Sequence, residues 1–310
     1  MLDRWTRRNF QVKAGMALGT STILGVPKSV QAVADNQPVI AIVTGPSKHP
    51  PGTHEVPATG RLLQYCVSQL IAAQAPNAFE LRLLEGWPNE PALLDRIACL
   101  VFLGDIFPPM RMTDPPRILA DIQRMADRGC GLVCIHYATG LGAEDVSADG
   151  SHPLLGWIGG YFATRCPHHQ SVARVFEAAT IEPARNPHPI LQGWESFTIH
   201  DEPYIQNYFG VDGLLPGVVI LATSQLPPEN PKAEAVAWAI ERADGGRGAG
   251  IVMPHFFKNW REDGLRKLIL NAIWWASHQQ VPPEGIDIRL DELAPFQPQA
   301  VEPVAKKARN

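Results

Sequence analysis

Residues 129–140 read G-C-G-L-V-C-I-H-Y-A-T-G, and this segment carries the clearest structural signal in the chain of 310 residues. The apolar run 132–135 has no polar alternation, which is typical of a strand that is buried on both faces of a parallel sheet. A helical pattern precedes the run, and His136 ends it. Because ligands of open α/β sheets bind beyond the carboxyl ends of the strands, His136 is a candidate site residue. A capped or core histidine is the alternative at this position.

The same pairing of strand and helix repeats through the first half of the chain. Hydrophobic periodicity predicts strands before residue 129 at 38–44, 79–84 and 98–103. It predicts helices at 59–74, 91–97 and 114–128. This alternation predicts an α/β fold with a doubly wound, mostly parallel sheet.

The second half of the chain has a looser pattern. Apolar strands are predicted at 171–176 and 217–224, a hairpin at 235–253 and a last helix at 261–277. We therefore expect one α/β domain over residues 35–283 with an elaborated second half. Residues 284–310 are rich in proline, glutamate and alanine, and this composition predicts a mobile tail.

The first 34 residues have the pattern of an export signal. Arg7-Arg8 lies in a twin-arginine motif, an apolar run follows at 14–26, and Ala32-Val33-Ala34 precedes Asp35. The apolar run is too short to span a bilayer and is diluted by Gly, Thr and Ser. We expect cleavage after Ala34, a periplasmic or secreted product, and no stable membrane insertion.

Composition and missing motifs exclude several classes of function. The net charge is -4 without a basic cluster in the mature part, which argues against a nucleic-acid partner. The five cysteines are odd in number and include no C-x-x-C pair, so no disulfide framework is expected. No G-x-G-x-x-G, P-loop, H-E-x-x-H or G-x-S-x-G motif is present. Nucleotide, flavin and serine-hydrolase functions therefore have no support.

Three histidines follow predicted strands and are candidate ligands. His54 lies in the loop after the first strand, His136 ends the central strand, and His255 follows the strand that ends near Met253. The carboxyl ends of parallel strands share one edge of a sheet, so these side chains could converge. Imidazole and carboxylate groups suit either a divalent metal such as zinc or general acid/base catalysis. Their spacing matches no known metal motif, and scattered surface histidines are the alternative.

Four segments in order resemble the ThuA-like family, which is named for a trehalose-utilisation protein. They cover residues 45–55, 131–138, 188–204, and 254–260 with 268–276. The resemblance implies a flavodoxin-like fold similar to that of class I glutamine amidotransferases. Those enzymes have a cysteine nucleophile in the turn after the central strand, where this chain has His136, while Cys134 lies two residues earlier in mid-strand. Amide hydrolysis by a thiolate is therefore not expected.

The resemblance also implies a function in carbohydrate catabolism with a small-molecule carbohydrate as partner. A keto-sugar or 3-keto-glycoside suits this chemistry, because a carbonyl acidifies the neighbouring C–H for removal by a base. The expected enzyme is a sugar isomerase, lyase or glycoside-cleaving enzyme. The alternative is a catalytically inert carbohydrate-binding or scaffold domain of the same fold.

We assign the site residues as follows. The catalytic candidates are His136, Glu202 and His200. The candidate ligands of a divalent metal are His54, His136 and His255. The substrate-binding candidates are Tyr137, Asp201, Tyr204, Trp260 and Asp105. Trp157, Trp194 and Trp260 could stack on a sugar ring, with core packing as the alternative for each.

Overall fold

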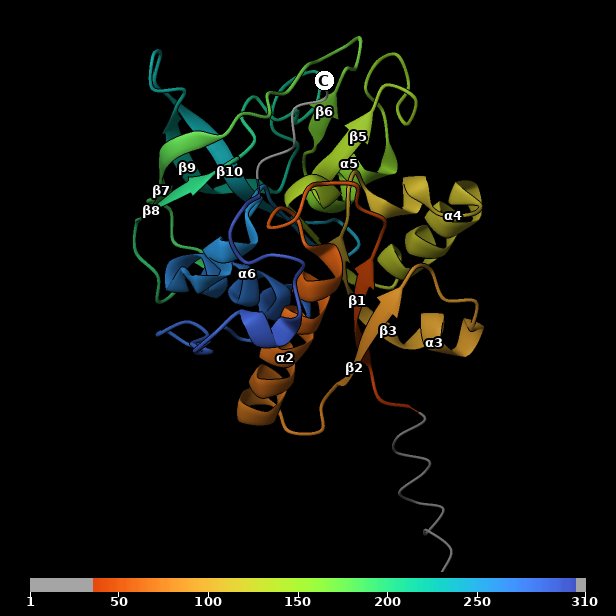
Figure 1. The fold of residues 1–310 in the computed structure, drawn as a ribbon. Coiled ribbons are helices and arrows are strands. Elements are labelled where there is room, and N and C mark those ends of the chain that lie inside the picture. The colour runs from red at the N-terminus through yellow and green to blue at the C-terminus, as the bar shows by residue number, and fades with distance from the viewer. Residues whose placement is uncertain (1–35, 305–310) are drawn as a thin grey trace, which may run out of the picture. The chain divides into compact units, whose positions relative to one another are not determined.

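A nine-stranded sheet runs through the protein in the computed structural model, which describes residues 36–304 (Figure 1). The predicted export signal over residues 1–34 lies outside the described residues. Five strands are parallel, in the order β2 (Glu80–Glu85), β1 (Val39–Thr44), β3 (Ile97–Leu103), β4 (Gly131–Ile135) and β11 (Arg247–Ile251). The sheet continues with four antiparallel strands, β10 (Lys232–Glu241), β9 (Val218–Leu226), β7 (Phe176–Pro183) and β8 (Phe197–Asp201).

The parallel half has the strand order of a flavodoxin-like fold, with β1 next to both β2 and β3. The predicted doubly wound α/β fold is therefore confirmed, and the antiparallel strands form its elaborated second half. β4 is fully buried between β3 and β11, as its apolar run predicts. β10 and β11 form the predicted hairpin.

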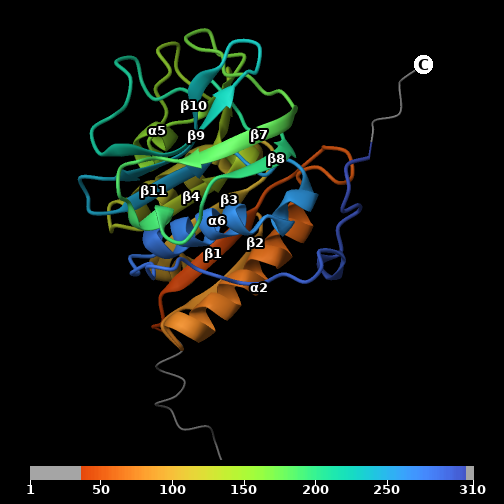
Figure 2. The ribbon, with the colours of Figure 1, turned by 90° about the vertical axis from the view of Figure 1, so that its left-hand side faces the viewer.

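Helices cover both faces of the parallel half. Alternate side chains of β1 contribute to two separate cores, as the pleat of a strand requires. One core lies under α2 (Val56–Gln74) and α6 (Asp263–Ala276), the two helices in front of the sheet in Figure 2. The other lies under α3 (Pro91–Arg96), α4 (Pro115–Ala126) and α5 (Pro153–Ile158).

Short elements complete the fold. A small second sheet pairs β5 (Gly140–Gly142) with β6 (Phe162–Thr164). The 3-10 turns are η1 (Pro108–Arg111), η2 (His136–Thr139), η3 (Pro189–Leu191), η4 (Phe257–Arg261) and η5 (Ala294–Phe296). No helix within residues 36–304 is both long enough and apolar enough to cross a bilayer.

The segment from residue 284, predicted as a mobile tail, is packed against the domain as far as residue 304. Ile286 and Leu293 are buried in the core under α2 and α6. The Arg61 guanidinium of α2 donates to the Phe296 carbonyl at 2.8 and 2.9 Å. A few anchoring side chains are enough to hold an extended segment, and average composition does not reveal them.

Candidate functional site

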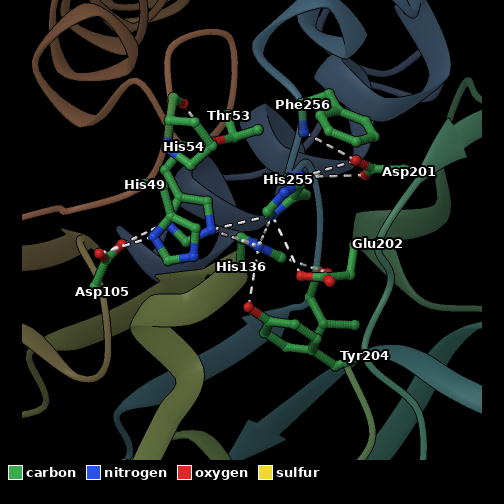
Figure 3. Close-up of polar contacts among 12 residues, drawn as sticks. His49, Thr53, His54, Asp105, His136, Asp201, Glu202, Tyr204, His255 and Phe256 are labelled. Atoms are coloured by element: carbon green, nitrogen blue, oxygen red, sulfur yellow. Dashed lines mark hydrogen bonds and ion pairs between the residues drawn. The ribbon is translucent and has the colours of Figure 1, made fainter. Parts of the chain in front are cut away.

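Three histidine rings converge at the carboxyl edge of the parallel strands (Figure 3). His54 comes from the loop between β1 and α2, His136 follows β4, and His255 follows β11. His54 Nε2, His136 Nε2 and His255 Nδ1 are each 3.1 Å from the other two atoms. All three residues are buried. The structure therefore brings together the three predicted metal-ligand candidates.

The backbone holds two of these histidines in a conformation that side chains rarely adopt. His54 and His136 have φ angles of 48° and 49°, in the left-handed region. The His54 N–H donates to the His255 carbonyl at 2.7 Å, and the Thr139 hydroxyl donates to the His136 carbonyl at 2.6 Å. Residues in such conformations cost about 1–3 kcal/mol each and cluster at functional sites.

Hydrogen bonds on the outer side of two rings fix their tautomers. His136 Nδ1 lies 3.1 Å from the Val252 carbonyl, which can only accept, so Nδ1 carries the proton. His54 Nδ1 is hydrogen-bonded to the Asp105 carboxylate in the same way. In the neutral rings, the Nε2 atoms of His54 and His136 are consequently unprotonated and face each other across 3.1 Å. This arrangement attracts a cation.

The carboxylate that orients His54 has a second histidine partner. Asp105 Oδ2 accepts from His49 Nδ1 at 2.8 Å and from the Lys48 N–H at 2.8 Å. Burial alone would raise the pKa of Asp105, but the hydrogen bonds from His49 and His54 hold this pKa far below its usual range. Asp105 therefore stays ionised and orients imidazole rings, so the structure gives it a different role from the predicted contact with substrate.

The rings themselves favour the neutral form. Burial lowers the pKa of His54, against the opposing effect of its hydrogen bond to Asp105. Burial also lowers the pKa of His136 well below its usual range, with a further contribution from the neighbouring rings of His54 and His255. Neutral imidazole is the form that binds metal ions.

Glu202 and Tyr204 complete the buried side of the cluster. Glu202 Oε2 lies 3.3 Å from His255 Nδ1, and burial raises the pKa of this carboxyl to about 7. The Tyr204 ring stacks on His136 with centroids 4.5 Å apart, and its hydroxyl lies 3.1 Å from His136 Nε2. Burial raises the pKa of Tyr204 well above its usual value, so the hydroxyl keeps its proton. A base and a hydrogen-bond donor thus lie next to the facing nitrogens of the histidine cluster.

Asp201, predicted to bind substrate, has an internal partner instead. Its side chain is fully buried, and Oδ1 accepts from the backbone N–H groups of His255 and Phe256, both at 3.0 Å. These bonds hold the segment that carries His255. Asp201 therefore positions His255 through its backbone, and the Asp201 side chain has no exposed surface for a substrate.

Further predicted site residues differ in how they are placed. Tyr137 is half-buried beside the cluster, with its ring centroid 5.9 Å from that of His54. His200 is outside the cluster, because it stacks on Phe256 and lies 4.0 Å from Glu177. Successive residues of a strand face opposite ways, so β8 directs Asp201 inward and His200 away.

The tryptophans near the motifs are core residues. Trp157, Trp194 and Trp260 are 4%, 6% and 2% exposed, which leaves no face on which a sugar could stack. Trp260 lines a cavity beside His54 and His136 whose volume, about 20 Å³, is enough for a single water molecule.

His49 is a site residue that the sequence prediction missed. Its ring stacks on His54 with centroids 3.5 Å apart and shares the Asp105 carboxylate. Its side chain is 28% exposed, so it lies at the solvent side of the cluster. The signal was its position in the same loop as His54, but a loop has no periodicity from which a shared direction could be inferred.

The cysteines do not offer a nucleophile. All five lie within the described residues and are buried, and Cys134 points into the core from β4. Burial raises the pKa of the Cys134 thiol far above its usual value. A thiol that stays protonated is a poor nucleophile.

Comparisons with known proteins agree with this fold. The family model ThuA, described as trehalose utilisation, matches residues 47–276. A putative ThuA-like protein from Bacteroides uniformis is similar in structure, with a TM-score of 0.54 and 16% identity over 77% of this chain and 92% of that chain. Among curated proteins, none matches the chain.

Two further structures share only a coarse similarity. A glutamine amidotransferase from Methylobacillus flagellatus has a TM-score of 0.38 and 14% identity, over 78% of this chain and 92% of that chain. Agd3, described as a novel carbohydrate deacetylase, has a TM-score of 0.41 and 12% identity, over 78% of this chain and 32% of that chain.

The role of Asp201 can be tested by its removal. We expect Asp201→Ala to lower the free energy of unfolding by about 2–4 kcal/mol, because the two buried N–H groups of His255 and Phe256 lose their acceptor. Urea denaturation measures this change, with the exposed Asp212→Ala as the matched control. A loss no larger than that of the control would contradict the proposed positioning role.

Proposed function

Because the chain belongs to the ThuA family, whose description is trehalose utilisation, we propose that it is a metal-assisted enzyme of carbohydrate catabolism. In this proposal the ligands of a divalent metal such as zinc are His54, His136 and His255. The substrate is a keto-sugar or 3-keto-glycoside. The observation that carries the proposal is the triangle of ring nitrogens 3.1 Å apart, in which at least two nitrogens are unprotonated.

The dimensions of the triangle fit a metal ion. Three nitrogen ligands about 2.0–2.1 Å from one ion, at angles between octahedral and tetrahedral values, lie about 2.8–3.4 Å apart. Two of the rings also have the outer-shell partners that are typical of metal ligands, the Asp105 carboxylate and the Val252 carbonyl. Three protein ligands leave room for a substrate oxygen, as in catalytic rather than structural zinc sites.

The residues around the triangle support acid/base chemistry on a carbonyl substrate. A bound metal would polarise the carbonyl oxygen as a Lewis acid. Glu202, with a pKa near 7, removes the proton from the carbon next to the carbonyl. The Tyr204 hydroxyl donates a hydrogen bond to the oxygen on which negative charge develops.

The proton has two possible destinations, which correspond to two reactions. In isomerisation, Glu202 returns the proton to the neighbouring carbon. In β-elimination from a 3-keto-glycoside, Glu202 takes the proton from C2, the C1–O bond breaks, and the leaving oxygen receives a proton. Glu202, protonated by the first step, supplies this proton and returns to its carboxylate form. The proposed catalytic residues are thus Glu202 and Tyr204. Of the other two predicted catalytic residues, His136 is a metal ligand in this proposal and His200 has no part in it.

The alternative of an inert carbohydrate-binding domain has less support. A binding module needs accessible aromatic faces, whereas the three tryptophans considered for this role are buried. An inert domain has no need for a buried cluster of neutral histidines with oriented tautomers. The strained backbone at His54 and His136 also favours an active site.

Metal content is the first test. Protein purified without added metal and analysed by inductively coupled plasma mass spectrometry should contain about one divalent ion per chain. The His136→Ala variant should lose this ion, because only two of the three proposed nitrogen ligands remain. His278→Ala is the matched control, since His278 is exposed and bonds to Gly129 at the opposite end of β4. A wild-type protein that holds no ion even after incubation with zinc would refute the metal site.

Turnover of a 3-keto-glycoside with a chromogenic leaving group is the second test. Glu202→Gln should lower kcat by about 10²–10⁴, because the amide cannot accept the proton. Metal content should be unchanged, which separates the loss of a base from the loss of a ligand. The exposed Glu177→Gln serves as the matched control. An unimpaired Glu202→Gln enzyme would exclude Glu202 as the base, and wild-type protein that binds the glycoside without turnover would support the inert domain.

We propose further that the protein is exported to the periplasm or secreted through the twin-arginine route. The signal is Arg7-Arg8 followed by the apolar run and Ala32-Val33-Ala34. Mass spectrometry of the exported protein should find Asp35 as the first residue. Replacement of both arginines by lysine should retain the protein in the cytoplasm. Exported soluble protein that keeps Met1 would contradict cleavage.

A further inference from the structure

Residues 297–304, here called the C-terminal strap, lie beyond the segment matched by the family model, which ends at residue 276. Figure 2 shows this dark blue segment passing the orange loop between β1 and α2. The Val304 N–H donates to the Pro51 carbonyl at 3.0 Å. A Cβ at Gly52 would lie 2.2 Å from the Glu302 carbonyl oxygen, so only glycine permits this close approach. The strap therefore packs directly on the loop that carries His54.

Glu55 joins the strap to this loop. Its carboxylate is buried and accepts from the Gly52 N–H at 2.8 Å within the loop. From the strap it accepts the N–H of Gln299 at 2.9 Å and that of Ala300 at 3.2 Å. Both carboxylate oxygens are used, and these three bonds come from backbone donors. A buried carboxylate held in this way specifies one conformation of both segments.

The turn that Glu55 stabilises sets the direction of the His54 ring. His54 and Glu55 are consecutive residues with left-handed φ angles of 48° and 42°. On the inner side the turn is held by backbone bonds, from His54 to the His255 carbonyl at 2.7 Å and from Phe257 to the Gly52 carbonyl at 3.0 Å. On the outer side it is held by Glu55 and the strap.

We infer that the C-terminal strap is a part of the functional site and that Glu55 is its positioning residue. The strap holds the strained turn through Glu55, and the turn places His54 Nε2 within reach of His136 and His255. This inference rests on the proposed function, in that it treats His54 as a metal ligand.

The experiment uses the full-length protein and removes the hydrogen bonds between Glu55 and the strap in two ways, by changing the acceptor or the donors. Glu55→Gln removes the charge of the acceptor, and the double substitution of Gln299→Pro with Ala300→Pro removes two of its donors. Glu229→Gln is the matched control, because it makes the same change in an exposed ion pair with Arg174 outside the strap. Zinc affinity is measured by competition with a chelator. Hydrogen exchange reports on the amides of residues 52–57, and thermal unfolding reports on the whole fold.

Both test variants should weaken zinc binding by about 10-fold or more, as expected for loss of an outer partner of a ligand. Exchange at residues 52–57 should become faster, and Glu229→Gln should change neither the zinc affinity nor this exchange. A protein with all three substitutions should lose no more zinc affinity than either test variant alone, because the substitutions act on one interaction.

The possible failures are distinct from each other. Unchanged zinc affinity and unchanged exchange in both test variants would overturn the inference, and a lower unfolding temperature alone would mean that the strap only stabilises the fold. If wild-type protein binds no zinc, the proposed metal function fails. Exchange at residues 52–57 then still decides whether the strap holds the turn.

Discussion

The arrangement of the site depends on one electrostatic constraint, the two unprotonated nitrogens of His54 and His136 that face each other at 3.1 Å. Each lone pair is directed inward because the opposite nitrogen donates to an acceptor outside the cluster, Asp105 or the Val252 carbonyl. Water screens little in a buried site, so the repulsion between the lone pairs is strong unless a hydrogen-bond donor, such as the Tyr204 hydroxyl beside His136, or a positive charge offsets it. Burial opposes a proton on these rings, and in the proposed function a metal cation supplies the positive charge.

The parallel sheet supplies the site by collecting residues from distant parts of the chain. In a flavodoxin-like order, β1 and β3 are the strands from which successive connections leave in opposite directions, and ligands bind at the crevice between them. The loop after β1 contributes His49 and His54, and the loop after β3 contributes Asp105. β4 and β11 complete the cluster with His136 and His255. The antiparallel extension adds a buried wall, because β8 ends at Asp201 and leads into Glu202 and Tyr204.

The sequence was sufficient to predict the three central histidines, because each follows an apolar strand and the carboxyl ends of parallel strands share an edge. It was not sufficient for His49, whose ring reaches the site from an irregular loop by stacking on His54 and bonding to Asp105. The sequence also placed His200 in the site, whereas its side chain lies outside the cluster. Buried positions alternate along β8, and the neighbouring Asp201 occupies the inward one. The order of the antiparallel strands depends on pairings between distant segments, which local periodicity does not encode.

The turn after β4 illustrates how one architecture can serve different chemistry. In class I glutamine amidotransferases this turn presents a cysteine, and here it presents His136, with a φ angle of 49° at the end of the central strand. A thiolate acts by covalent attack, whereas a neutral imidazole acts as a ligand or a base and therefore needs partners. Those partners are present, because His54 and His255 come within 3.1 Å and Tyr204 stacks on the ring. In the proposed function the nucleophile position therefore holds a metal ligand, and the chemistry takes place on a bound carbonyl instead of by acyl transfer.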